Sequence, residues 1–313
     1  MIIISLFLAF LFPFELFLFS YAFLGPLHYL TELEWLDSKS YFFNKKILYI
    51  FILVSAIISI IFLYTYFTNN YILSNDFYGI ILAMIFLLIF ILMEFPNKSK
   101  KLFIAIFTSL LIIFLVYKYS NGFMIIGLLL PTLVHVYLFT GLFMLYGYLK
   151  APNIYSLLPI IFLFFVPFII YFIPIDLHQS ISEKYFSLYR STSFMQLNNK
   201  FEIFLTTIFK NNNSVGLREY VLKFQIFMAF AYTYHYLNWF SKTSIIGWTK
   251  TFTPKKTFFI VFIWTISSLL FLYNYSLGLY VIFFLSLLHV LAEFPLNIQT
   301  IKYISNKLIL TLK

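Results

Sequence analysis

Apolar residues run through this chain in long stretches, separated by short blocks that contain lysine. The stretches do not alternate polar and apolar residues with a period of two, as the strands of an outer-membrane barrel do. Each is close to or above the roughly 17–25 residues that a helix needs to cross a bilayer core. The pattern predicts about nine membrane-spanning helices, over residues 2–30, 47–67, 77–95, 102–119, 123–149, 154–175, 221–241, 257–274 and 277–295.

The composition supports a lipid environment for these helices. Of the 313 residues, 62% are hydrophobic and only 10% are charged, and the mean hydropathy is +0.94. Soluble domains carry roughly 25% charged residues, and no water-soluble core could bury so much apolar surface. We therefore expect an all-α, polytopic transmembrane helical bundle that forms one integral membrane domain over residues 1–313.

Several chemistries are excluded by residue content. The chain has no cysteine, which rules out disulfides, thiolate-bound zinc, iron–sulfur clusters and cysteine nucleophiles. It contains no glycine-rich phosphate loop, no GxSxG sequence and no HExxH sequence. The net charge is +10, but the lysines lie in short blocks between apolar stretches, which is typical of membrane proteins and not of nucleic-acid-binding proteins.

The lysine blocks also predict an orientation. They follow the odd-numbered apolar stretches, as with Lys45 and Lys46 after the first and Lys255 and Lys256 after the seventh. The short loops after the even-numbered stretches are almost uncharged. The positive-inside rule then places the N-terminus outside and the C-terminus in the cytoplasm. The expected location is the bacterial cytoplasmic (inner) membrane.

The sixth connection, residues 176–218, is long and mixed in charge. Within it Ile181, Tyr185, Phe186 and Tyr189 recur at helical spacing, which predicts an interfacial helix or lid on the outer side. A helix that merely packs on the outer face fits the same spacing.

The first and last thirds of the chain resemble each other. His28-Tyr-Leu precedes a lysine pair, two apolar stretches and Glu94-Phe-Pro, and His235-Tyr-Leu precedes the same series, which ends in Glu293-Phe-Pro. This similarity is explained either by a parallel three-span repeat or by chance in a sequence dominated by a few hydrophobic residue types. The repeat units would be residues 1–97 and 219–298.

Two histidine–glutamate pairs lie at the ends of apolar stretches. Glu32 follows His28 by four positions, and Glu293 follows His289 by four. This spacing puts both side chains of a pair on one face of a helix. Ionisable groups at membrane depth are costly and indicate a functional site.

The predicted orientation brings more such groups toward the cytoplasmic leaflet. Glu94 and His235 lie at cytoplasmic ends of their stretches, and His135 lies nearer mid-membrane. Imidazole and carboxylate donors without thiolates suit iron, manganese, zinc or copper. Interfacial histidines, and glutamates that pair with nearby lysines such as Lys39, are the alternative. We predict a metal site with ligands His28, His135, His235 and His289, and with catalytic, orienting or alternate-ligand roles for Glu32, Glu94 and Glu293.

Two further features bear on this region. Pro13 lacks a helix donor and is expected to kink the first stretch. Tyr232, Tyr234 and Tyr236 flank His235, where a phenol either hydrogen-bonds a metal-bound oxygen or serves a helix–helix contact.

The segment Leu24-Gly25-Pro26-Leu27-His28, followed by Glu32, resembles the Gly-x-Pro-His plus acid motif of the Brp/Blh membrane carotene dioxygenases. These are polytopic enzymes whose four-histidine non-haem iron site splits β-carotene into retinal. Here proline precedes the histidine by two positions, and the acid is glutamate instead of aspartate. The resemblance implies iron ligands at His28, His135, His235 and His289.

We therefore expect an integral membrane, metal-dependent oxygenase with an iron cofactor and a lipophilic substrate such as a carotenoid or lipid. Its partners would be the lipid bilayer and this small molecule, with no nucleic acid. One alternative is a proton- or ion-coupled transporter in which the same histidines and glutamates titrate. Another is a structural or assembly subunit whose polar cluster holds helices together.

Overall fold

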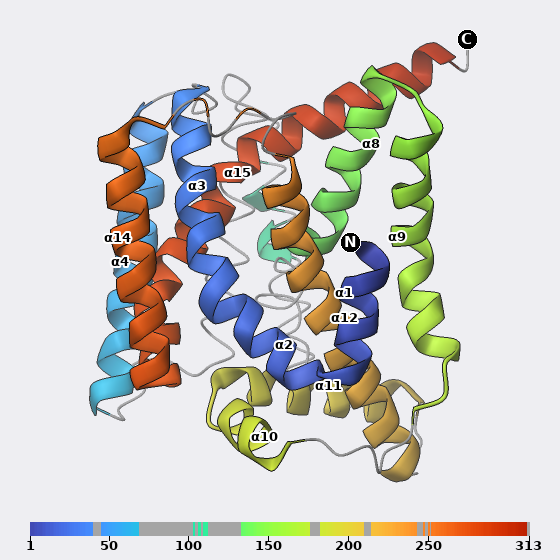
Figure 1. Cartoon of the computed structure of the whole chain (residues 1–313), viewed down its shortest axis with the longest axis vertical. Helices are drawn as coiled ribbons and strands as arrows, with labels where there is room; N and C mark the ends of the chain where they lie inside the picture. Colours follow the sequence, from blue (N-terminus) through green and yellow to red (C-terminus); the bar gives the residue numbers. More distant parts are fainter. Residues whose placement is uncertain are drawn as a thin grey trace.

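The computed structural model describes residues 1–39, 45–68, 133–175, 182–209, 214–242 and 252–311, with a few single positions between them. In this part of the chain the regular structure is entirely helical, without a strand (Figure 1). The predicted span 77–95, most of 102–119, and the residues Glu94 and His178 lie outside the described residues.

Helical segments follow one another along the described part of the chain, and two of them are π-helical. They are α1 (Ile2–Leu11), α2 (Pro13–Phe19), η1 (Ser20–Leu24), α3 (Gly25–Ser38), α4 (Lys45–Thr68), η4 (Val134–Phe139), α8 (Thr140–Lys150), α9 (Ile154–Phe172), α10 (Glu183–Arg190), α11 (Ser193–Phe209), α12 (Ser214–Ser241), α14 (Pro254–Tyr273) and α15 (Tyr275–Thr311).

Four stretches among the described residues are long and apolar enough to cross a membrane. They are Ile47–Thr68, Ile154–Phe172, Pro254–Tyr273 and Tyr275–Leu310. The first three expose most of their apolar side chains, as helices that face lipid do. The prediction of a helical membrane protein is therefore confirmed, whereas the count of nine spans and the orientation stay predictions.

Helix α12 lies in the middle of the bundle (Figure 1). It packs against α1, α2, α3, α9, α11 and both π-helical segments. Residues 228–236 are all buried, and this run is longer than two helical turns. Every face of α12 at this level is consequently covered by protein, which is why it can carry polar residues such as Thr233 and His235.

The predicted first span, residues 2–30, is not a single helix. Helix α1 ends at Leu11, Phe12 takes φ −136° and ψ 60°, and Pro13 starts α2 as its first residue. Proline fits the first helical position because it has no N–H to leave unpaired. The predicted kink at Pro13 is confirmed, and Figure 1 shows the chain reversing there before it continues through α2 and α3.

Side chains from α14 and α15 bind backbone carbonyls around η1. The Tyr275 hydroxyl donates to the Leu18 carbonyl at 2.9 Å, and Trp264 Nε1 donates to the Phe23 carbonyl at 2.8 Å. These bonds anchor the π-helical turn that immediately precedes Gly25 and the helix of His28. Short π-helical segments are often found at functional sites.

Helix α9 contains Pro167, which has no N–H to donate to the carbonyl of Leu163. The hydroxyl of Tyr137, on η4, donates to that carbonyl instead. The bond joins α9 to the π-helical segment that carries His135.

Helices α10 and α11 lie at the end of the molecule opposite the C-terminus (Figure 1). The rings of Phe186 and Tyr189 on α10 lie 5.1 Å and 4.9 Å from the ring of Phe14 on α2. The helical spacing predicted for this segment is confirmed from Glu183 onward. Its apolar face packs on α2, which agrees with the simpler alternative of a packed helix.

Helix α15 runs well past the predicted end of the last span at residue 295. It continues through Pro295 to Thr311, and its C-terminal part extends beyond the bundle in Figure 1. The helix packs against α3, α4, α8 and α14. Its middle part therefore holds His289 and Glu293 inside the protein.

Candidate metal centre

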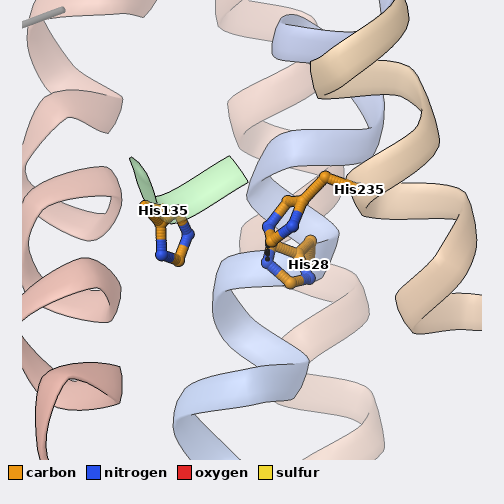
Figure 2. A group of neighbouring side chains, drawn as sticks. All are labelled: His28, His135 and His235. Atoms are coloured by element: carbon orange, nitrogen blue, oxygen red, sulfur yellow. Dashed lines mark hydrogen bonds between the residues drawn. The ribbon is translucent and has the colours of Figure 1, made fainter. Parts of the chain in front are cut away.

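Four histidines from four separate helical segments converge inside the bundle. His28 comes from α3, His135 from η4, His235 from α12 and His289 from α15. Their exposed fractions are 1%, 3%, 7% and 2%, so water does not solvate these rings. Figure 2 shows His28 and His235 joined through their ring nitrogens, with His135 facing them from another segment.

The four rings form a closed quadrilateral. The ring centroids of His28 and His235 are 4.6 Å apart, and those of His235 and His135 are 4.9 Å apart. The other two sides, His135–His289 and His289–His28, measure 4.8 Å and 5.5 Å. The set of ligands predicted from the sequence is therefore brought together as one cluster.

The ring nitrogens face one another in pairs. Nε2 of His235 lies 3.0 Å from Nε2 of His28, and Nε2 of His289 lies 2.9 Å from Nε2 of His135. Two imidazole nitrogens bound to one ion at about 2.0–2.1 Å, with a bond angle of about 90–110°, lie roughly 2.9–3.4 Å apart. Each pair thus has the separation of two ligands on a single metal ion.

Thr140 determines which nitrogen of His235 carries its proton. The Thr140 hydroxyl oxygen lies 2.9 Å from the Val136 carbonyl and 2.8 Å from His235 Nδ1. The carbonyl can only accept, so the single hydroxyl proton goes there and the hydroxyl accepts from Nδ1–H. In the neutral ring Nε2 then has a lone pair, which faces His28.

Glu293 has the corresponding position beside His135. Its Oε2 lies 2.5 Å from His135 Nδ1 and also accepts from Asn297 Nδ2 at 3.4 Å. A carboxylate on the outer nitrogen leaves the other nitrogen free to bind a metal, as in many metal sites. Glu293 was predicted to pair with His289 on the same helix. It pairs instead with His135, which comes from another helical segment.

Glu32 lies on the inner side of the cluster. Its Oε2 is 3.0 Å from His28 Nε2, and the side chain is 3% exposed. The predicted pair of His28 and Glu32 is confirmed, and pairing of Glu32 with Lys39 at the surface is wrong. Glu34, two positions later, has the surface role and pairs with Lys256.

The nitrogen and oxygen atoms at the centre of the cluster carry few protons. When the Nδ1 atoms of His235 and His135 carry the ring protons, their Nε2 atoms carry none. A single proton on His28 Nε2 cannot be donated to both His235 and Glu32. Buried nitrogen and oxygen atoms with too few protons to hydrogen-bond one another are satisfied by a bound cation. The residues present therefore fit a bound metal ion, with nitrogen donors and at least one adjacent carboxylate.

Aromatic side chains surround the cluster. The ring of Tyr29 stacks on His289 at 4.2 Å, and its hydroxyl lies 2.8 Å from the hydroxyl of Tyr236. Trp239 lies 5.5 Å from His28 and donates to the Thr31 hydroxyl at 3.0 Å. Tyr236 thus makes the helix–helix contact that was one of its two predicted roles, and the shell keeps water away from the rings.

Gly25 permits the contact between the two tyrosines. A Cβ atom at this position would lie 3.0 Å from the Tyr29 hydroxyl and 3.2 Å from the Tyr236 hydroxyl. Both distances are shorter than ordinary contacts between non-bonded atoms. The glycine of the Leu24–His28 segment is therefore needed for close approach of α3 and α12 beside the cluster.

The four histidines, Glu32 and Glu293 were predictable from the sequence, whereas the predicted residue Glu94 lies outside the described residues. Thr140 was not predicted, because a threonine in an apolar helix usually bonds only its own backbone. The one signal for Thr140 is its position, five residues after His135. The π-helical turn at His135 has no sequence signal that we can identify.

Comparison with family models, curated proteins and solved structures finds no match for this chain. Its function is therefore inferred from the geometry of the cluster and its surroundings.

Proposed function

We propose that this protein is an integral membrane, metal-dependent oxygenase that acts on a lipophilic substrate such as a carotenoid or another lipid. One observation carries the proposal: four buried imidazoles from four helical segments place their Nε2 atoms in pairs at 3.0 Å and 2.9 Å. His28, His135, His235 and His289 would hold the ion. The thiolate-free, nitrogen-rich donor set suits iron, and iron bound there would supply activation of dioxygen.

The surroundings of the cluster support a lipophilic substrate. The rings lie inside a bundle whose outer helices expose apolar side chains, and Tyr29 and Trp239 pack directly on them. A dry, aromatic site favours an apolar molecule and protects reactive species from water. The resemblance of the Leu24–His28 segment to the carotene dioxygenase motif favours a carotenoid, and the lysine pattern favours the cytoplasmic leaflet of a bacterial inner membrane.

The first test is metal content. We expect the protein purified in detergent and supplied with Fe²⁺ to retain about one equivalent of metal per chain. His28→Ala and His289→Ala should lose it, because each removes one member of the ring. His178→Ala is the matched control, since His178 is the one histidine not assigned to the cluster. Retention below about a tenth of an equivalent of iron, zinc, copper or manganese by the unmodified protein would exclude the oxygenase.

The second test addresses the reaction. The iron-loaded protein is incubated with β-carotene in detergent micelles under ¹⁸O₂, and the products are analysed by mass spectrometry. The proposal predicts labelled cleavage products that are absent with the His289→Ala variant. A metal-loaded protein that leaves β-carotene and extracted membrane lipids unlabelled has no oxygenase activity on lipids.

The two alternatives give different results in the same preparations. A transporter would be active in vesicles without metal, and its histidine variants would change the pH dependence of transport. A structural subunit would keep its partners after either histidine is replaced.

A further inference from the structure

Two glutamates are buried beside the histidines, and both are costly to place there. Glu32 is 3% exposed and Glu293 is 2% exposed. Burying a carboxylate in an apolar interior is strongly unfavourable unless a cation or strong hydrogen bonds replace the lost hydration. The partners of each carboxylate therefore indicate what it does.

Glu293 contacts the outer nitrogen of its histidine. Its Oε2 lies against His135 Nδ1, and Asn297 donates to the same oxygen. Nε2 of His135 faces the opposite way, toward His289. Glu293 is thus separated from the centre by the imidazole ring that it orients.

Glu32 contacts the inner nitrogen. Its Oε2 lies 3.0 Å from His28 Nε2, the same atom that is 3.0 Å from His235 Nε2. An oxygen of Glu32 and one ring nitrogen each of His28 and His289 lie within 4.8 Å of one another. Apart from the His28 imidazole, no hydrogen-bond donor reaches Oε2 within the described part of the chain.

We infer that Glu32 is a fifth, anionic ligand of the metal ion, whereas Glu293 only orients His135. The inference rests on the proposed metal centre and deepens it. The resulting donor set is four neutral imidazoles and one carboxylate oxygen. The negative charge of Glu32 directly on a divalent ion offsets half of the ion's own charge, which lowers the cost of burying that ion. A hard oxygen donor also favours Fe²⁺ or Mn²⁺ over Cu⁺.

The test uses Co²⁺ as a probe, because its visible absorption reports the number and kind of donors bound to it. Affinity and spectrum are measured for the full-length protein in detergent and for Glu32→Gln and Glu293→Gln, which remove the same charge with little change of shape. Glu34→Gln is the matched control on the same helix, since Glu34 pairs with Lys256 at the surface.

We expect Glu293→Gln to lower Co²⁺ affinity by about 10–100-fold, the usual effect of losing an orienting partner, and to keep the shape of the spectrum. Glu32→Gln should lower affinity further and shift the absorption bands, because a donor on the ion itself has changed. Glu34→Gln should resemble the unmodified protein. An unshifted spectrum in Glu32→Gln, or equal shifts in both variants, overturns the inference.

A second variant covers the case in which Glu32→Gln does not fold, as judged by size-exclusion chromatography. Glu32→Asp keeps the charge but shortens the side chain, so a directly bound carboxylate must change its bond and shift the Co²⁺ bands. An unchanged spectrum with Glu32→Asp contradicts direct binding. Failure of the unmodified protein to bind Co²⁺ at all overturns the proposed metal centre instead, which keeps the two failures distinguishable.

Discussion

The Nε2 atoms of His135 and His289 lie 2.9 Å apart, although 154 positions separate the two residues in the chain. Packing of α8 and α15 against each other brings them together, since η4, which carries His135, immediately precedes α8, and His289 lies within α15. The same holds for His28 and His235, 207 positions apart, whose helices α3 and α12 are in contact. The cluster thus links distant parts of the chain, and an ion bound there would stabilise the bundle.

Thr140 should tune metal affinity through the tautomer of His235. Thr140→Val keeps the shape but removes the acceptor for Nδ1–H, so the ring loses the bond that directs its lone pair inward. We expect a loss of about 10–100-fold in Co²⁺ affinity in a detergent titration. Thr140→Ser, which retains the hydroxyl, should restore most of it.

Thr65→Val is the control for this prediction. Thr65 on α4 bonds the Ile61 carbonyl in the way that Thr140 bonds Val136, but it lies on a different helix from every histidine of the cluster. Equal affinities for Thr140→Val and Thr65→Val would show that Thr140 does not orient His235.

Gly25→Ala should destabilise the protein and disturb the cluster. The added methyl group would meet the Tyr29 hydroxyl at 3.0 Å, so the tyrosine pair must separate and Tyr29 must shift on His289. Overpacking of this kind costs about 1–3 kcal/mol. The expected results are a lower midpoint of thermal unfolding in detergent and weaker metal binding.

Gly147→Ala provides a matched comparison, because a methyl group at that position on α8 meets no atom within 4 Å. It should leave both quantities nearly unchanged. Combining Gly25→Ala with Tyr29→Phe, which removes the nearest atom, should recover part of the loss. The steric explanation is wrong if Gly25→Ala and Gly147→Ala behave alike.

Tyr137 and Pro167 should be thermodynamically coupled. In the native chain the Tyr137 hydroxyl donates to the Leu163 carbonyl, because Pro167 has no N–H to donate to it. Tyr137→Phe should therefore cost about 1 kcal/mol, the usual net value of a hydrogen bond. With alanine at position 167 the helix supplies its own donor, and the same change should cost clearly less.

A double-mutant cycle of unfolding midpoints, with Tyr137→Phe, Pro167→Ala and the combined variant, measures this coupling. Additive effects of the two substitutions would mean that the tyrosine does not replace the missing helix bond.

The fold was predictable from the sequence wherever a pattern of apolar residues reflects a single helix. Continuous apolar stretches predicted α4, α9 and α14, because a lipid-facing helix must be apolar along its whole length. Pro13 predicted the kink, but not that the chain reverses there. The end of α15 was placed too early, since Pro295 is accommodated within the helix.

The site was predictable in its residue types and not in its pairings. A spacing of four positions correctly joined Glu32 to His28 on α3. The same spacing suggested that Glu293 serves His289, whereas the structure places it against His135. Local spacing shows that two side chains share a helix face, but a partner from another helix can lie closer than the neighbour on the same one.

The amino-acid sequence alone determined that this is a helical membrane protein and that its few buried histidines and glutamates are exceptional in it. Both conclusions follow from hydrophobicity and local periodicity, which depend only on neighbouring residues. Tertiary structure decided that four histidines lie in one cluster, that Thr140 contacts one of them, and that Glu32 lies against a ring nitrogen inside the cluster while Glu293 lies against one on its outer side. These relations depend on how helices pack and rotate against one another, and the packing of many side chains sets that rotation.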